Sequence, residues 1–271
     1  MPKPSKNSGE SGELLVKAKL VKMMMEGQKF VDGSKIKQID AGDFKSRDGS
    51  YTYNQDIDET SIKEVCESGA EYKYDRIRDI LAPLHIVKAG SRMKADVSIN
   101  NVNFSIKSSA VRPAIINHTF REGFSVAARH ANANLDLLDS EISRYWESRC
   151  QEIIGEDVNG NSRRRFNLFW SSKFKERFRP IFNYFAFEGT GAGLSPMPAK
   201  YILEFEDPLD PKTWKIIDKD NFYNICWDNL VFSMRHKGKK IETDTSLSAE
   251  NKKWARNING KLRGRLHVRT N

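Results

Sequence analysis

The sequence KADVSINNVNFSIK, residues 94–107, contains two runs of alternating apolar and polar residues separated by Asn100-Asn101. Asparagine adopts positive φ more readily than most residues, so this pair favours a two-residue β-hairpin turn. The turn sets a register in which Asp96 lies opposite Ser105, with Lys107 one diagonal step away. Because side chains alternate across a strand, the apolar residues share one buried face. That face is predicted to hold Val97, Ile99, Val102, Phe104 and Ile106.

A carboxylate, a short polar side chain and a lysine meet on the polar face of this predicted hairpin. The hard oxygen of Asp96, joined by the backbone carbonyl of Ile106, suits Mg²⁺. The ammonium of Lys107 can stabilise charge on a phosphate or help to lower the pKa of an attacking water. The pattern indicates a divalent-metal and phosphodiester site. An ordinary surface ion pair between Asp96 and Lys107 is the competing interpretation.

The same residues resemble the two half-motifs of the PD-(D/E)XK nuclease superfamily, and type II restriction endonucleases in particular. Ala95-Asp96 matches the first acidic half-motif, and Ser105-Ile106-Lys107 matches the second. The sequence departs from the family pattern where Ala95 replaces proline and where Ser105 replaces the second acid, which removes one direct metal ligand. The resemblance implies catalytic roles for Asp96, Ser105 and Lys107, with Mg²⁺ as the cofactor.

In that family a further acid often comes from the helix that precedes the hairpin. Here the helix predicted around residues 72–81 carries Asp75 and Asp79, and Glu71 directly precedes it. Their spacing of four residues places the three acids on one helical face. The resemblance therefore implies Glu71 or Asp75 as an additional metal ligand.

The charge balance favours a polyanionic partner. The chain has 45 Lys and Arg against 36 Asp and Glu, a formal net charge of +9, as expected of a nucleic-acid-binding protein. The predicted partner is double-stranded DNA, and cutting both strands of a symmetric site is simplest for a homodimer. The candidate DNA contacts lie in three places: directly after the hairpin, after a tight turn, and within a basic strand near the C-terminus. They are Ser108, Ser109, Arg112, Asn117, His118, Arg121, Arg163, Arg164, Arg165, Lys261, Arg263 and Arg265.

Other classes of protein are disfavoured. No apolar run reaches the roughly 18–20 residues needed to span a bilayer, and no secretory signal is evident, which predicts an intracellular, cytoplasmic protein without a membrane partner. The glycine-rich segment 189–193 lacks the lysine of a phosphate-binding loop, so no nucleotide cofactor is expected. Cys66, Cys150 and Cys226 form neither a zinc pattern nor a disulfide framework.

The predicted fold class is α/β, with a restriction-endonuclease-like mixed central sheet flanked by helices and an elaborated C-terminal half. The organisation expected is a disordered tail over residues 1–12, a catalytic core over 13–155 and an aromatic and basic DNA-recognition part over 156–271. Helices are expected near residues 14–25, 61–67, 72–81 and 118–153, irregular structure over 33–60, strands at 201–205 and 214–217, and β-like segments at 159–170 and 182–193.

The function predicted is that of a sequence-specific double-stranded DNA endonuclease. Three alternatives stay open: a repair or recombination nuclease of the same fold, a non-catalytic DNA-binding protein, and an RNA-binding protein that stacks bases on exposed aromatics. Metal-dependent cleavage separates the two nucleases from the others. A defined fragment pattern separates the restriction enzyme from the repair nuclease.

Overall fold

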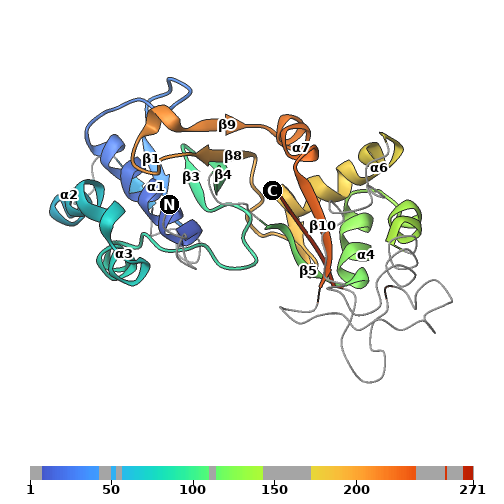
Figure 1. Ribbon diagram of the computed structural model, residues 1–271. Helices are drawn as coiled ribbons and strands as arrows, with labels where there is room; N and C mark the ends of the chain where they lie inside the picture. The colour runs from blue at the N-terminus through green and yellow to red at the C-terminus, as the bar shows by residue number, and fades with distance from the viewer. Residues whose placement is uncertain are drawn as a thin grey trace. The chain divides into compact units, whose positions relative to one another are not determined.

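The computed structural model describes residues 8–42, 50–52, 57–109, 114–142, 172–235, 254 and 265–270 (Figure 1). The chain divides into two units, the first formed by residues 1–112 and 195–222, and the second by 113–194 and 223–271. This division differs from the predicted boundary at residue 155. Strands from the C-terminal half of the chain complete the sheet of the first unit, so the N-terminal half does not form a unit by itself.

The first unit is built on a six-stranded mixed sheet with the order β2-β1-β3-β4-β8-β9. β3 and β4 form the predicted hairpin, β8 runs parallel to β4, and the other neighbouring pairs run antiparallel. The prediction of a mixed central sheet flanked by helices is confirmed. The strands are β1 (Gln38–Asp40), β2 (Ser50–Thr52), β3 (Val97–Ile99), β4 (Val102–Ser108), β8 (Tyr201–Phe205) and β9 (Lys215–Ile217).

Two of these strands come from residues 33–60, which were predicted to be irregular. That prediction was wrong because β1 and β2 are only three residues long. A strand of that length shows too little alternation to be recognised. In β1 only Ile39 is buried, between the half-buried Gln38 and Asp40.

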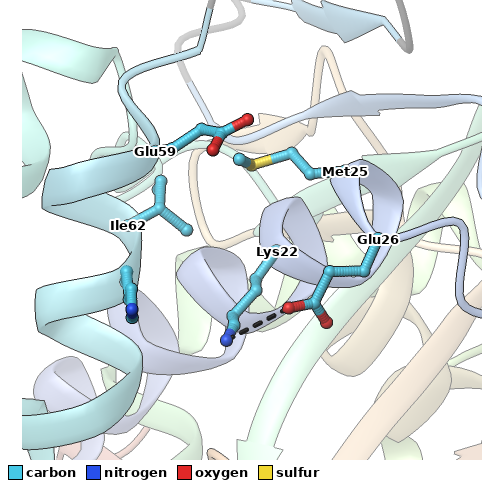
Figure 2. A pocket seen from close by; sticks show the side chains of 6 residues that line it. Lys22, Met25, Glu26, Glu59 and Ile62 are labelled. Carbon is cyan, nitrogen blue, oxygen red and sulfur yellow. Dashed lines mark ion pairs between the residues drawn. The ribbon is translucent and has the colours of Figure 1, made fainter.

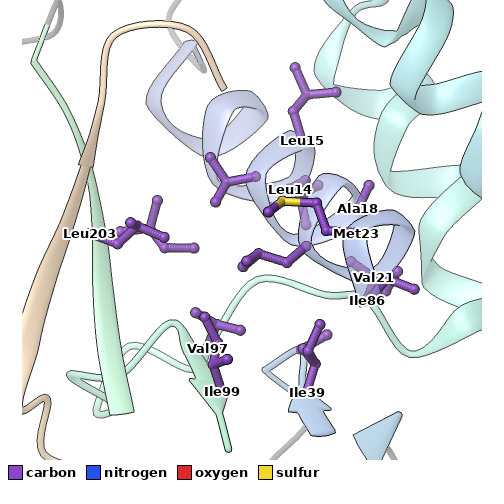
Figure 3. Close-up of a cluster of buried hydrophobic side chains, with 14 of the residues drawn as sticks. Leu14, Leu15, Ala18, Val21, Met23, Ile39, Ile86, Val97, Ile99 and Leu203 are labelled. Atoms are coloured by element: carbon purple, nitrogen blue, oxygen red, sulfur yellow. The ribbon is translucent and has the colours of Figure 1, made fainter. Parts of the chain in front are cut away.

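Helix α1 (Ser8–Met25) packs against the sheet on one side and against α2 (Glu59–Ser68) and α3 (Tyr74–Leu81) on another (Figure 1). Its apolar residues are buried around the whole helix, as expected of a helix covered on several sides. Figure 3 shows Leu14 and Met23 of α1 in one cluster with Val97 and Leu203 of the sheet. Because α1 begins at Ser8, residues 8–12 form its first turns instead of the predicted tail.

The helices that cover α1 agree broadly with prediction. α2 begins at Glu59, two residues before the predicted start at 61, because Asp58 is its N-cap. The Asp58 carboxylate accepts hydrogen bonds from the backbone N–H groups of Thr60 and Ser61 at 3.1 and 3.3 Å, the usual N-cap arrangement. Helix α3 ends at Leu81, before Pro83, as predicted. Short 3₁₀ turns are η2 (Gly69–Glu71), η3 (Ala82–Leu84) and η5 (Pro211–Thr213).

The second unit contains a three-stranded antiparallel sheet with the order β10-β11-β5. Residues 136–142 are helical, which with α4 agrees with the two-piece helix predicted over 118–153. Among the described residues, no helix is long and apolar enough to cross a membrane. The other elements are β5 (Ala114–Thr119), α4 (Arg121–His130), α6 (Ser172–Asn183), the π-helical turn η4 (Tyr184–Glu188), β6 (Gly189–Thr190), β7 (Gly193–Leu194), α7 (Lys219–Trp227, which starts in the first unit), β10 (Leu230–Arg235) and β11 (Arg265–Thr270).

The β-like segment predicted over 182–193 is mostly helical. Phe174, Phe178 and Phe182 recur every four residues and are buried on one side of α6, so the aromatic residues follow a helical period and not a strand period. Only residues 189–194 form a hairpin, β6–β7. The other predicted β-like segment, 159–170, lies outside the described residues.

The β3–β4 turn has the expected geometry. Asn100 and Asn101 have φ values of 49° and 64°, as a two-residue type I′ turn requires, and the register pairs Val97 with Phe104 and Ile99 with Val102 as predicted. The Asn100 amide also ties the turn to the segment around the start of β1. Its Oδ1 accepts from two backbone N–H groups and its Nδ2 donates to a carbonyl. The three partners are Lys37, Gln38 and Lys35.

Glycine substitutions distinguish the positive φ of the turn from the hydrogen bonds that the Asn100 side chain makes. Asn101→Gly should leave the free energy of unfolding unchanged or raise it by up to about 1 kcal/mol, because glycine adopts positive φ without steric cost. Asn100→Gly should lower it by about 1–3 kcal/mol, because backbone groups near β1 lose their partners. Urea unfolding of both variants measures the difference. Equal effects would contradict the bridging role of Asn100.

Candidate metal and phosphate site

Asp96 lies at the point where β3 leaves β4. The ladder of β3 covers β4 only as far as Phe104, and beyond it the backbone N–H of Ile106 donates to Asp96 Oδ2 at 2.7 Å. Ser105 Oγ donates to the same oxygen at 2.9 Å. The carboxylate thus satisfies a backbone donor that β3 no longer reaches. Asp96 and Ser105 are cross-strand neighbours, as predicted.

Lys107 completes the predicted group on this face. Its Nζ lies 3.7 Å from Asp96 Oδ2, and the two side chains are 29% and 15% exposed. The N–H and C=O of one residue in an extended strand point to the same edge. The carbonyl of Ile106, like its N–H, therefore faces the side on which Asp96 lies. Ser105 is almost fully buried, and its hydroxyl is used to hold Asp96.

Helix α1 contributes a second acid to this region. Lys17 is fully buried, and its Nζ donates to Glu13 Oε1 at 2.6 Å and to the carbonyl of Val87 at 2.8 Å. Burial raises the pKa of Glu13, Asp96 raises it further, and Lys17 and Lys107 oppose the change. Lys17 Nζ, which Glu13 holds, and the carbonyl oxygen of Asp96 both border Gly42, so this acid lies near the start of the hairpin.

A glycine allows the chain to pass close to the buried lysine. Gly42 has a φ of +106°, a conformation that other residues rarely adopt. A Cβ at this position would lie 2.7 Å from the carbonyl oxygen of Val87, 2.9 Å from Lys17 Nζ and 3.2 Å from the carbonyl oxygen of Asp96. The segment after β1 can therefore pack against the site only with glycine here.

A third lysine lies beside the hairpin. The backbone N–H of Lys94 donates to the carbonyl of Met197 at 3.1 Å and to Ser195 Oγ at 3.0 Å. Burial lowers the pKa of Lys94 from its ordinary value of 10.5 to about 8, Lys107 lowers it further as a like charge, and Asp96 opposes both. The Lys94 side chain is half-buried.

The acids proposed from the helix before the hairpin lie elsewhere. Asp75 and Asp79 are exposed on α3 and pair with Arg78 at 3.0 and 2.8 Å. Glu71 is exposed in η2. Within the described residues, the acid whose pKa depends on Asp96 and Lys107 is Glu13, from the first helix.

The sequence does contain a signal for Glu13. Glu13 and Lys17 are spaced i, i+4 in a helix whose other positions from Leu14 to Met24 are mostly apolar on all sides. A helix of that pattern is covered all round, so its charged residues must be buried and paired. A helix was predicted near residues 14–25, but the burial of its charged residues was not.

The polar residues that follow the hairpin are placed on strands. Ser108 ends β4, and Ser109 donates through its N–H and Oγ to the carbonyl of Phe205. In the second unit, Asn117 is exposed on β5, and the ring of His118 stacks on that of His267 at a centroid distance of 4.7 Å. The structure does not test their predicted contact with DNA.

Arg121 has a protein partner. Its Nε lies 2.9 Å from Asp139 Oδ1 and its Nη2 lies 2.6 Å from Asp139 Oδ2, which is a two-pronged ion pair. Trp254 Nε1 donates to the same carboxylate at 2.9 Å. Arg121 therefore stabilises the second unit, and binding phosphate would compete with Asp139.

Of the remaining candidate DNA contacts, one lies in the described part of the chain and six lie outside it. Arg265 begins β11, and its guanidinium lies 4.4 Å from the centroid of the Phe120 ring. Leu266 and Val268 of this predicted basic strand are buried, but so is His267 between them, so burial does not alternate along the strand. Outside the described residues lie Arg112, Arg163, Arg164, Arg165, Lys261 and Arg263.

Helix α6 carries cations that the sequence reasoning missed, because this region was expected to be β-like at its end. Lys173 and Arg177 are exposed. Lys175 lies 5.8 Å from the Trp227 ring centroid and Arg179 lies 5.2 Å from that of Tyr223. These stacked and exposed cations are suited to contact a polyanion.

One cavity lies away from the hairpin, between the end of α1 and the start of α2 (Figure 2). It has a volume of about 160 Å³ and is lined by Lys22, Met25, Glu26, Glu59, Ile62 and Lys63. The Lys22–Glu26 ion pair, at 3.1 Å, borders it. Of the two acids that line it, Glu26 is paired with Lys22, and no residue of the hairpin site borders the cavity.

Comparisons of the chain with protein-family models, with curated proteins and with solved structures found no match. The chemistry of the site is therefore inferred from its own residues and from their geometry.

The buried charge of Lys94 should give the protein a measurable pH dependence. The unfolded chain holds the Lys94 proton up to about pH 10.5 and the folded protein up to about pH 8, so the free energy of unfolding rises with pH between these values. The contribution is at most on the order of 3 kcal/mol. Lys94→Met should therefore be more stable than the wild type at pH 7, with the difference shrinking toward pH 10. Urea unfolding at both pH values measures it, and a constant difference would contradict this assignment.

Proposed function

We propose that this protein is a Mg²⁺-dependent endonuclease that hydrolyses phosphodiester bonds in double-stranded DNA, of the sequence-specific restriction type. The observation that carries the proposal is the group formed by Asp96, Lys107 and Glu13. Asp96 and Lys107 lie 3.7 Å apart at the open end of a hairpin, and Glu13 holds the Lys17 ammonium that packs, through Gly42, beside the backbone of Asp96. The resemblance of Ala95-Asp96 and Ser105-Ile106-Lys107 to the PD-(D/E)XK half-motifs supports the same chemistry.

The donor atoms fit a magnesium ion. In the described residues, the hydrogen bonds and ion pairs of Asp96 all involve Oδ2, and those of Glu13 all involve Oε1. Each acid thus keeps one oxygen for a cation, and the Ile106 carbonyl faces the same region. Mg²⁺ prefers such hard oxygen ligands and keeps several waters, so one or two carboxylates with a substrate phosphate suffice.

No group of three or more His, Cys, Asp and Glu side chains in the described part of the chain is arranged to hold a metal by itself. A site that shares its ion with the substrate phosphate fits this arrangement better than a closed protein cage. When bound, the ion would polarise the phosphate and supply a reactive water. Asp96 and Glu13 would hold it.

The other residues of the hairpin position and stabilise charge. Ser105 is a positioning residue, because its hydroxyl donates to Asp96 and so fixes the direction of the free carboxylate oxygen. Lys107 can donate to a non-bridging phosphate oxygen and stabilise the charge that develops there. Such stabilisation is strongest in a partly desolvated site, and Lys107 is only 29% exposed.

The second unit supplies the cations for holding DNA. Lys173 and Arg177 on α6 are exposed, and Arg265 on β11 is half-buried. Phosphate contacts of this type give affinity, and base contacts give sequence preference. A homodimer would place one hairpin site on each strand of a symmetric target. A non-catalytic DNA-binding protein remains the second candidate, since the cations alone would serve that function.

Incubation with a mapped plasmid tests the proposal. With Mg²⁺ we expect discrete fragments, and with a chelator none. Asp96→Asn preserves acceptors for Ser105 and Ile106 but loses the charge that holds the cation, and Lys107→Met loses the stabilising charge. Each should lower the rate by about a hundredfold or more, while thermal unfolding shows that the variants are folded. Near-normal cleavage by either variant would remove the hairpin as the active site.

A matched pair of variants identifies the additional acid. Glu13→Gln should lower metal-dependent cleavage strongly, and Asp75→Asn, which loses only an exposed pair with Arg78, should leave it unchanged. Because Glu13→Gln leaves Lys17 without its charged partner, Glu13→Gln/Lys17→Met serves as a second variant that removes both buried charges. The rate as a function of Mg²⁺ concentration is the measurement. If Asp75→Asn loses activity and Glu13→Gln does not, the additional acid is Asp75 on α3 and not Glu13.

A further inference from the structure

Glu204 lies on the polar face of the main sheet, beside the hairpin site. In the parallel pair β4–β8, the register partner of Glu204 is Lys107, and that of Ile202 is Ser105. Neighbouring strands lie about 4.7–4.9 Å apart, and residues directly opposite each other project from the same face. Glu204 therefore projects from the face that carries Ser105 and Lys107. A strand was predicted at 201–205, but its position beside β4 was not.

Lys107 thus has an acid on each side. On the side of β3, Asp96 Oδ2 lies 3.7 Å from its Nζ. On the side of β8, Glu204 is directly opposite. The Lys107 side chain is 29% exposed and Glu204 is half-buried, so water screens their charges less than on an open surface. Opposite charges in directly opposed positions stabilise a strand pair.

In this structure the ammonium of Lys107 is paired with Asp96 and not with Glu204. Among the described residues, no lysine or arginine forms an ion pair with the Glu204 carboxylate. Lys215, its register partner on β9, is exposed, and a fully solvated ammonium gains little from pairing. The Glu204 carboxylate is therefore available to accept the ammonium of Lys107.

A divalent cation on Asp96 changes which acid suits Lys107. Asp96 Oδ2 already accepts from Ser105 Oγ and from the N–H of Ile106, at 2.9 and 2.7 Å, which leaves the other carboxylate oxygen for the cation. The cation and the ammonium would then lie on one carboxyl group and repel each other. Lysine has a flexible four-carbon stem, so the ammonium can move to Glu204 while the backbone of Lys107 stays in β4.

We propose that Glu204 is a positioning residue that accepts the Lys107 ammonium when a divalent cation binds Asp96. The inference rests on the proposed function and adds to it an acid from β8, a strand outside the resemblance to known nucleases. Asp96 then holds the cation and Glu204 holds the ammonium, so that both positive charges can face the substrate phosphate together. Without Glu204, the ammonium stays beside Asp96 and weakens the binding of the cation.

Binding of Mn²⁺ to the full-length protein without DNA tests this. Mn²⁺ takes the same oxygen ligands as Mg²⁺, and electron paramagnetic resonance measures the free ion. Glu204→Gln should weaken Mn²⁺ binding about fivefold, because the ammonium keeps its place beside Asp96. Glu204→Asp, which keeps the charge, should bind Mn²⁺ more tightly than Glu204→Gln. Circular dichroism and thermal unfolding establish that each variant is folded.

Glu206→Gln is the control, because it removes the same charge from an exposed position just after β8. It should change the affinity for Mn²⁺ less than about twofold. The double variants with Lys107→Met separate positioning from direct binding of the cation. With no ammonium to displace, Glu204→Gln should alter the affinity no more than Glu206→Gln does.

Three results would overturn the proposal. An equal loss of affinity with and without Lys107 would mean that Glu204 binds the cation directly, and no loss in either background would make it an ordinary cross-strand partner of Lys107. Absence of Mn²⁺ binding by the wild type is the third. Plasmid cleavage with Mg²⁺ is measured in parallel. If the wild type shows the coupling but does not cleave, the nuclease proposal fails and the assignment of Glu204 stands. If it cleaves without the coupling, only the assignment of Glu204 fails.

Discussion

Strand β4 lies inside the main sheet and has to satisfy backbone hydrogen-bonding groups on both edges. β8 runs along one edge, whereas β3 is three residues long and covers only the first part of the other. The N–H of Ile106 therefore needs an acceptor that is not a strand, and the carboxylate of Asp96 takes that place at 2.7 Å. This exchange of a ladder bond for a side-chain bond fixes Asp96 beside Lys107 and leaves the end of the hairpin open. The rest of the candidate site is arranged around that opening.

The same region concentrates charge in the interior of the first unit. Lys17 is fully buried, and its Nζ donates to Glu13 and to the Val87 carbonyl. Burying such a pair gives little net stability, because the desolvation of both ions offsets their attraction. Lys94 adds a charge that burial disfavours, as its lowered pKa indicates. A fold selected for stability alone would place apolar residues here, so the retained charges favour a role in binding.

The two kinds of binding in the proposed function depend on different residues of this site. Metal binding would depend on the free oxygens of Asp96 and Glu13, and phosphate binding on the positive charge of Lys107. A phosphodiester site needs both, because the substrate is an anion and the cation has to lie next to it. The cations of α6 and β11 belong to the second unit and, under the proposed function, would provide longer-range attraction for a polyanion.

The hairpin could be predicted from the sequence because the pattern that specifies it lies within one short segment. Alternation in residues 94–107 and the Asn100-Asn101 turn predicted the register, the buried face and the neighbourhood of Asp96, Ser105 and Lys107, and the structure confirms all three. Glu13, Lys94 and the division into units depended on contacts between distant segments. β8 had to return beside β4, α1 had to be covered on several sides, and the 195–197 loop had to hold Lys94. No local pattern encodes such contacts, because burial and charge neighbours are set only when segments far apart in the chain pack together.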